Sequence, residues 1–260
     1  MSIKRPYYRI FRPQEKSDFL TTDYVLHKKN ILNWSSPLRA FHLIVSDFRK
    51  ICEYIDPCDC NLATYSHRIY ELFIRTCTEI ESNFKSILKA NGYSSKKNGK
   101  IKKDNDWNIE DYKKLEAILK LSDYKVLINF WDNGRGRVVA PYQNWAKGKS
   151  GKLVWYSFYN EVKHNREDSF YLASIENLIY AICGLFVILF SQYSVQVFSP
   201  YQIIDSYNSF DNNLGRFICG ESDFIFAIFL PKWGKSEKYD FNWESLCESD
   251  DDPFEQFFKK

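Results

Sequence analysis

The chain has 260 residues, with 36 lysines and arginines against 33 aspartates and glutamates and a formal net charge of +3. Because 45% of the residues are hydrophobic and 18% are aromatic, the composition excludes wholesale disorder, which requires few aromatic residues and a large net charge. The length allows one large domain or two small ones. A nearly balanced charge says little about a partner, because it can conceal strongly charged segments.

The N-terminal residues carry Lys4, Arg5, Arg9 and Arg12 without an apolar run behind them, which is unlike a secretory signal. The seven cysteines are an odd number without a framework spacing, as is typical of proteins whose thiols stay reduced. The longest apolar run, residues 178–190, is too short to cross a bilayer and indicates a buried core helix. We therefore expect a cytoplasmic protein with free thiols that does not enter a membrane.

The N-terminal part of the chain predicts an extension followed by two helices. Residues 1–36 are mixed and aromatic with no clear period, and we assign them to an N-terminal extension. A serine pair followed by Pro37 supplies a helix cap and a proline suited to the first turn, which predicts a helix over about 37–55. A longer helix is expected over about 62–90, ended by Asn91 and a glycine. Both helices place apolar residues three and four positions apart on one face.

The middle of the chain alternates between polar linkers and regular elements. Residues 93–106 form a polar linker with a flexible, lysine-rich stretch, and a shorter helix is expected over 108–121. Alternating apolar residues followed by a glycine-containing turn predict a small hairpin insertion at about 124–140. A helix over 153–164 and a strong helix over about 168–193 follow.

The C-terminal part differs in pattern from the helical region. Residues 194–236 form a mixed segment that contains one expected strand over 224–230. Residues 237–260 form an acidic, aromatic tail that we expect to be loose, although its rings also suggest that it docks on a basic surface of this chain or a partner. The fold class is therefore mainly α: a bundle of about five helices over 37–193, with a small inserted hairpin and a short C-terminal β element.

The segment from Trp155 to Arg166 carries the most informative chemistry. On a helix, Trp155 lies on the buried face, while Asn160 and His164, one turn apart, project roughly opposite to it. Histidine moves protons near neutral pH, and Arg166 or Lys163 beside it could hold a phosphate or stabilise a developing oxyanion. The alternative is that His164 and Arg166 only complement the dipole at a helix C-terminus.

The Asn160-x-x-x-His164 pair, late in a bundle and followed by a very apolar helix, resembles the motif of the HEPN superfamily (higher eukaryotes and prokaryotes nucleotide-binding domains). In active members one helix carries an arginine, a polar residue and a histidine, and many are metal-independent endoribonucleases of prokaryotic defence and toxin systems that act as dimers. The resemblance covers about residues 62–193. Tyr159 stands where the motif has its arginine.

The resemblance implies an RNA-cleaving homodimer that needs neither a metal nor another cofactor, accompanied by a partner protein of a defence or toxin–antitoxin operon. It implies His164 as general acid or base, Asn160 as the group that orients the phosphate or the imidazole, and Arg166 as the group that neutralises transition-state charge. Arg166, or Arg75 from the long helix, could serve in place of the missing motif arginine. Two other functions stay open: a catalytically inactive HEPN-like interaction or regulatory module or nucleotide sensor, and a non-catalytic RNA-binding protein.

Basic residues surround the same helix and interleave with Tyr142, Trp145, Trp155 and Tyr156. Cations for the backbone and rings for unstacked bases are the combination that single-stranded nucleic acid favours, while a solvated lysine loop beside core tryptophans is the alternative. Residues 96–103 add five more lysines. The residues predicted to bind nucleic acid are Lys163, Arg135, Arg137, Lys147, Lys149, Lys152 and Arg75.

Two smaller groups of residues have alternative interpretations. Glu71 and Arg75 are four positions apart on the long helix, which favours a surface ion pair, although either residue could face the His164 groove. A cysteine group with a histidine nearby invites a zinc interpretation, but its spacing differs from that of common structural sites, so we expect no metal. That group comprises Cys52, Cys58, Cys60 and His67.

Overall fold

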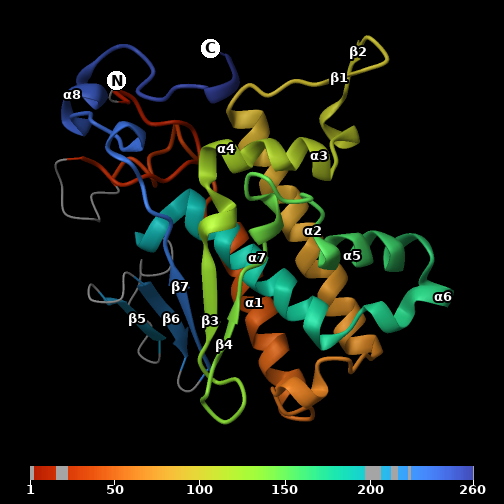
Figure 1. Ribbon diagram of the computed structural model, residues 1–260. Helices are drawn as coiled ribbons and strands as arrows, with labels where there is room; N and C mark the ends of the chain where they lie inside the picture. The colour runs from red at the N-terminus through yellow and green to blue at the C-terminus, as the bar shows by residue number, and fades with distance from the viewer. Residues whose placement is uncertain (1–2, 16–22, 197–205, 212–215, 222–223, 260) are drawn as a thin grey trace.

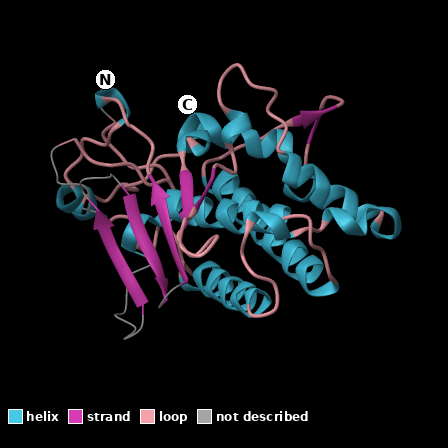
Figure 2. Ribbon diagram, turned by 60° about the horizontal axis from the view of Figure 1, so that its bottom comes forward, coloured by secondary structure: helices cyan, strands magenta, loops and turns pink. Residues whose placement is uncertain are grey.

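The computed structural model describes residues 3–15, 23–196, 206–211, 216–221 and 224–259. The chain is mainly α-helical, with one antiparallel sheet packed along one side of the helices (Figures 1 and 2). This arrangement confirms the predicted fold class. The longer helices are α1 (Ser35–Cys52), α2 (His67–Ala90), α5 (Val154–His164) and α7 (Ile175–Tyr193), and the shorter ones are α3 (Ile109–Tyr112), α4 (Glu116–Leu119), α6 (Arg166–Ser169) and α8 (Trp243–Glu248).

Two predicted helices are interrupted, so the expectation of continuous helices over 108–121 and 168–193 is wrong. The first consists of α3 and α4 joined by a 3₁₀ turn, and it ends at Lys120, whose φ of 51° is left-handed. The second begins as α6 and a 3₁₀ turn before α7 starts afresh behind Ser174. The Ser174 hydroxyl accepts a hydrogen bond from Asn177 N at 3.4 Å, which is the cap that starts the new helix.

The main sheet has the strand order β4-β3-β7-β6-β5, with every neighbouring pair antiparallel. The predicted hairpin and the predicted strand near residue 224 both form, but they lie in this one sheet, so the hairpin is not a small separate insertion. Val126 opposite Ile228, and Ile128 opposite Phe226, are buried pairs that join the two regions. The strands are β3 (Lys125–Ile128), β4 (Arg137–Val139), β5 (Ser206–Asp211), β6 (Arg216–Glu221) and β7 (Phe224–Phe229).

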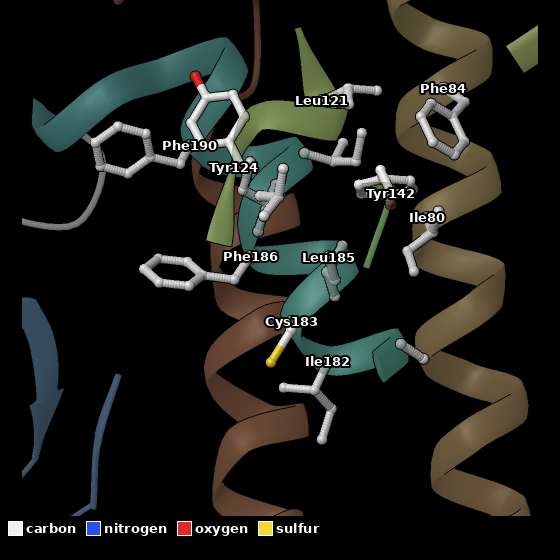
Figure 3. Close-up of a cluster of buried hydrophobic side chains, with 14 of the residues drawn as sticks. Ile80, Phe84, Leu121, Tyr124, Tyr142, Ile182, Cys183, Leu185, Phe186 and Phe190 are labelled. Carbon is white, nitrogen blue, oxygen red and sulfur yellow. The ribbon is translucent and has the colours of Figure 1, made fainter. Parts of the chain in front are cut away.

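The core centres on α7, which lies beside α1 and α2 (Figures 1 and 3). Among the described residues, one helix, α7, is long and apolar enough to cross a membrane by length and composition. However, 89% of its apolar stretch is buried inside the protein. It is therefore the core helix that the apolar run predicts. Figure 3 shows Phe186 and Phe190 of α7 on the side away from Ile80 and Phe84 of α2, so that α7 contributes to packing on both sides.

The acidic tail is not loose, and the expectation that it would be is wrong. Tyr239 is 0% exposed and forms isolated parallel bridges with residues 3 and 14. Asp240 pairs with Lys4, and Asp251 pairs with Arg5. The tail therefore packs on the N-terminal segment, beside which it lies in Figure 1, instead of on the cations near His164. Its aromatic residues bury enough apolar surface to fix it there.

Replacing Tyr239 should measure how firmly the two ends of the chain hold together. Its hydroxyl donates to Ile10 O at 3.1 Å and accepts from Tyr7 N at 3.1 Å. We expect Tyr239→Phe to lower the free energy of unfolding by about 1–3 kcal/mol, because a buried N–H loses its acceptor, and Tyr239→Ala by about 3–5 kcal/mol. Urea unfolding would measure both, with Tyr54→Phe, at an exposed position just after α1, as the control. If neither Tyr239 variant changed the free energy of unfolding, the tail would not be packed in solution.

Candidate active site

The structure places the predicted motif pair on the solvent side of α5. Trp155 and Val162 lie on the buried face, as predicted, whereas Asn160 is half-buried and His164 is exposed at the end of the helix. Tyr159, at the position of the motif arginine, is only 1% exposed, and its hydroxyl accepts a hydrogen bond from Lys163 Nζ at 3.1 Å. That position belongs to the core and cannot present a cation to a phosphate.

Backbone pairing joins the segment before α2 to the start of α7, which follows α6 closely in the chain. Ile175 N donates to Thr64 O at 2.8 Å, and Glu176 N donates to Leu62 O at 3.0 Å. Ser66 then caps α2 by accepting a hydrogen bond from Ile69 N at 3.2 Å, so the helix begins at His67. As a result, a side chain at residue 67 meets side chains that come about one hundred positions later in the sequence.

Arg166 is held between this histidine and two aromatic rings. Its Nη2 donates a hydrogen bond to His67 Nδ1 at 3.1 Å. Its Cζ lies 4.7 Å from the centre of the Tyr70 ring and 5.7 Å from that of Phe170, and the His67 and Phe170 rings are 4.8 Å apart. A guanidinium that is stacked and hydrogen-bonded in this way is fixed in orientation. We call His67, Tyr70, His164, Arg166 and Phe170 the His67–Arg166 corner.

The hydrogen bond from Arg166 fixes the tautomer of His67. A guanidinium carries donors only, so Nδ1 of His67 must be the acceptor, and the ring proton must lie on Nε2. The corner therefore offers an imidazole whose Nε2–H is available to donate. It borders an open hollow of about 430 Å³ lined by His67, Arg166, Glu167 and Phe170.

His164 belongs to the same corner through the chain itself. It precedes Arg166 by two residues, so the two Cα atoms are at most about 7 Å apart. Within the described part of the chain, His164 forms no hydrogen bond or ion pair and is free to act on a bound group. The chain thus brings the exposed His164 to a position two residues from the oriented Arg166 and its partner His67. Two imidazoles and a guanidinium are groups suited to proton transfer beside a phosphate.

Arg75 does not reach this corner. It pairs with Asp47 of α1, and that hydrogen bond holds the pKa of the Asp47 carboxyl below its usual value. The prediction of an ion pair between Glu71 and Arg75 is wrong, because Glu71 forms its ion pair with Arg68, at 3.1 Å. These residues line a hollow of about 630 Å³ between α1 and α2, in which the charged side chains pair with one another.

Arg135 and Arg137 also serve local contacts. Arg135 pairs with Asp132 in the β3–β4 turn. Arg137 pairs with Asp59 and, at 3.9 Å, with Glu176 of α7, and it lies 5.7 Å from the centre of the Trp131 ring. Figure 1 shows this turn at the bottom of the molecule, away from α5. The basic segment that the sequence suggests around His164 is therefore divided, because both arginines are held in ion pairs of the hairpin, whereas the lysines lie on the loop before α5.

The remaining predicted cations differ in their surroundings. Lys147, Lys149 and Lys152 are exposed on the loop before α5, whereas Lys163 lies over the Tyr159 ring at 5.1 Å from its centre. The rings expected to stack on bases are core residues instead, each between 0% and 4% exposed, because they fill the space between α2, α5 and α7. These are Tyr142, Trp145, Trp155 and Tyr156.

The cysteine group does not form a metal site among the described residues, where no cluster of three or more histidine, cysteine or carboxylate side chains could hold an ion. Cys58 and Cys60 form a disulfide, so the expectation that all thiols are free is wrong. The 3₁₀ turn over residues 59–61 brings their Cα atoms to 5.5 Å, a separation that a disulfide can span. His67 instead contacts Arg166.

No protein-family model, curated protein or solved structure matches this chain. The most important residue that the sequence does not reveal is His67. No local pattern signals its contact with Arg166, because the two residues are 99 positions apart. Tyr70 and Phe170 are hidden for the same reason: each reads as an ordinary apolar residue of its own segment until the fold joins them.

Proposed function

We propose that the protein is a HEPN-like, metal-independent endoribonuclease that acts in the cytoplasm as an effector of prokaryotic defence or toxin systems, with the His67–Arg166 corner as its active site. The observation that carries this proposal is the guanidinium of Arg166, which two rings and an imidazole orient two positions after the exposed His164. Such a set can bind a phosphate and move protons without a metal.

The chemistry follows from these groups. His164 takes the proton from a ribose 2′-hydroxyl, and the 2′ oxygen forms a bond to the adjacent phosphorus. The bond from phosphorus to the 5′ oxygen breaks, and that oxygen takes the proton back from the His164 imidazolium. Arg166 neutralises the charge on the phosphoryl oxygens, and the Nε2–H of His67 donates a hydrogen bond to one of them. The products are a 2′,3′-cyclic phosphate and a 5′-hydroxyl.

The products and the metal requirement test this proposal directly. We expect purified protein to cleave end-labelled RNA equally well with and without an excess of EDTA, because the corner uses imidazoles and a guanidinium instead of a metal-bound water. The 3′ fragments should lack a phosphate at their 5′ end, and the 5′ fragments should carry a cyclic phosphate. An EDTA-sensitive activity, or fragments with 5′-phosphates, would contradict the proposal.

A second function is favoured by one observation, the burial of Tyr159. Because the motif arginine has no counterpart on α5, the same fold could bind RNA or a partner protein as an inactive regulatory module. One result would favour this module over the endoribonuclease: the protein binds RNAs of many sequences but cleaves none of them, even with a second copy of the chain present.

A further inference from the structure

The lysine-rich stretch over residues 96–103 is a β-hairpin, and the expectation of a flexible loop is wrong. β1 (Lys96–Lys97) pairs with β2 (Lys100–Ile101) in antiparallel register. The turn residues Asn98 and Gly99 have φ angles of 51° and 78°, as a two-residue type I′ turn requires. Figure 1 shows the hairpin projecting from the upper right of the molecule.

The base of this hairpin is fixed to α3. Lys102, only 11% exposed, pairs with Asp111, whose side chain is 7% exposed. Asp111 also accepts hydrogen bonds from Tyr93 and from the backbone N–H of Asn108. Although burial alone would raise it, the bonds from Lys102 and these partners hold the pKa of Asp111 below its usual value. A buried, fully bonded ion pair therefore orients the exposed lysines of the hairpin.

The hairpin places like charges next to each other. In its register, Lys97 lies directly opposite Lys100, and like charges at such positions destabilise a strand pair. Neither side chain forms an ion pair with a described residue. The arrangement gains stability when an anion binds across both strands.

The charged surface continues from the hairpin to the loop before α5. The ammonium of Lys113, in the turn after α3, lies against Gly151 so closely that a side chain there would overlap it. The carboxylates on the hairpin and α3 segments include the exposed Asp106 and Glu110, and also Asp104, which pairs with Lys89. The lysine face, as we name it, comprises Lys96, Lys97, Lys100, Lys103, Lys113, Lys114, Lys147, Lys149 and Lys152.

The lysine face offers cations but no rings. Trp107, Tyr112 and Trp145, the aromatic residues of these segments, are buried in the core. Proteins that hold single strands stack bases on exposed aromatic side chains, whereas double-stranded RNA is recognised by its shape and by contacts to its backbone. A surface of lysines without exposed rings fits the second case.

We propose that the lysine face binds the phosphate backbone of double-helical RNA, and that the substrate of the His67–Arg166 corner is therefore a folded RNA with a helical part. The proposal rests on the proposed function only for the identity of the nucleic acid as RNA. We expect binding to depend little on base sequence, since ammonium groups aligned along a surface contact mainly the phosphates, which carry no sequence information.

Binding measured against salt concentration tests the lysine face. Fluorescence anisotropy would compare a blunt RNA duplex with one of its own strands, using the full chain and a variant with Lys96, Lys97, Lys100 and Lys103 changed to Gln. We expect the unchanged protein to prefer the duplex. We expect the variant to bind the duplex at least about tenfold more weakly, with a log–log salt slope shallower by up to about 3.6, because each of the four phosphate contacts contributes about 0.9.

The matched control changes four exposed lysines outside the face, Lys28, Lys29, Lys125 and Lys232, to Gln. It should bind like the unchanged protein. Equal affinity and slope in the hairpin variant, or tighter binding to the single strand than to the duplex, would overturn the proposal. RNA cleavage is measured separately from binding. If duplex binding depends on the lysines but no RNA is cleaved, only the proposed ribonuclease activity is refuted. If RNA is cleaved but duplex binding does not depend on the lysines, only the proposed role of the lysine face is refuted.

Discussion

His164→Ala should reduce RNA cleavage by about 10²–10⁴-fold, which is the usual contribution of a general acid or base. His164 is exposed and unpaired within the described residues, so its removal should change the free energy of unfolding by no more than about 0.5 kcal/mol. Single-turnover cleavage of a labelled RNA measures the first effect, and urea unfolding measures the second. RNA binding should be unchanged, because the proposed phosphate ligands stay in place.

His42→Ala is the matched control, since His42 is also an exposed histidine but lies on α1. It should cleave RNA at the rate of the unchanged protein. Equal cleavage by His164→Ala and the unchanged protein would show that His164 takes no part in the reaction.

Much of the fold follows from local patterns in the sequence. The stripe of apolar residues predicts α1 and α5 to within a few residues, because one face of each helix lies against the core. The alternation over residues 124–130 predicts β3 for the same reason, since one side of the strand is buried. The thirteen-residue apolar run predicts α7 as a core helix, because a helix that is apolar on all sides has to be surrounded by protein.

Other features depend on contacts that no local pattern contains. The acidic composition of the tail predicts disorder, but its rings bind to an N-terminal segment more than two hundred positions away. The exposed place of His164 follows from the helix pattern, whereas His67 joins it only through the pairing of residues 62–65 with 174–176. The Asn98-Gly99 pair is a local hairpin signal, but the lysines around it read equally well as a solvated linker.

Raising the pH above about 10 should unfold the protein in one transition. Tyr24, Tyr124, Tyr142 and Tyr239 are each at most 1% exposed, and burial raises the pKa of each phenol above its ordinary value. Below pH 10 the phenols are protonated in both states, and their full contribution to stability is present. Above it the unfolded chain loses protons that the folded chain keeps, so the free energy of unfolding falls until the pH passes the raised pKa values.

The size of this effect makes it decisive. Each buried phenol lowers the free energy of unfolding by about 1.4 kcal/mol for every pH unit above 10. Four phenols together therefore cancel a typical free energy of unfolding of about 5–15 kcal/mol within about one to three pH units. Circular dichroism and tyrosinate absorbance, recorded against pH, should change together. Complete tyrosinate formation with an unchanged circular dichroism spectrum would mean that these phenols ionise inside the folded protein, and so are not buried as described.

The number of transitions reports whether the chain ends and the helical core form one cooperative unit. Tyr24 and Tyr239 lie between the two ends of the chain, with ring centres 5.7 Å apart, whereas Tyr124 and Tyr142 pack beside α7. All four belong to one continuous hydrophobic core. Ionisation at either place should therefore unfold the other, and near-UV and far-UV spectra should follow a single curve. Two separate transitions would show that the packed ends can open while the helices around α7 stay folded.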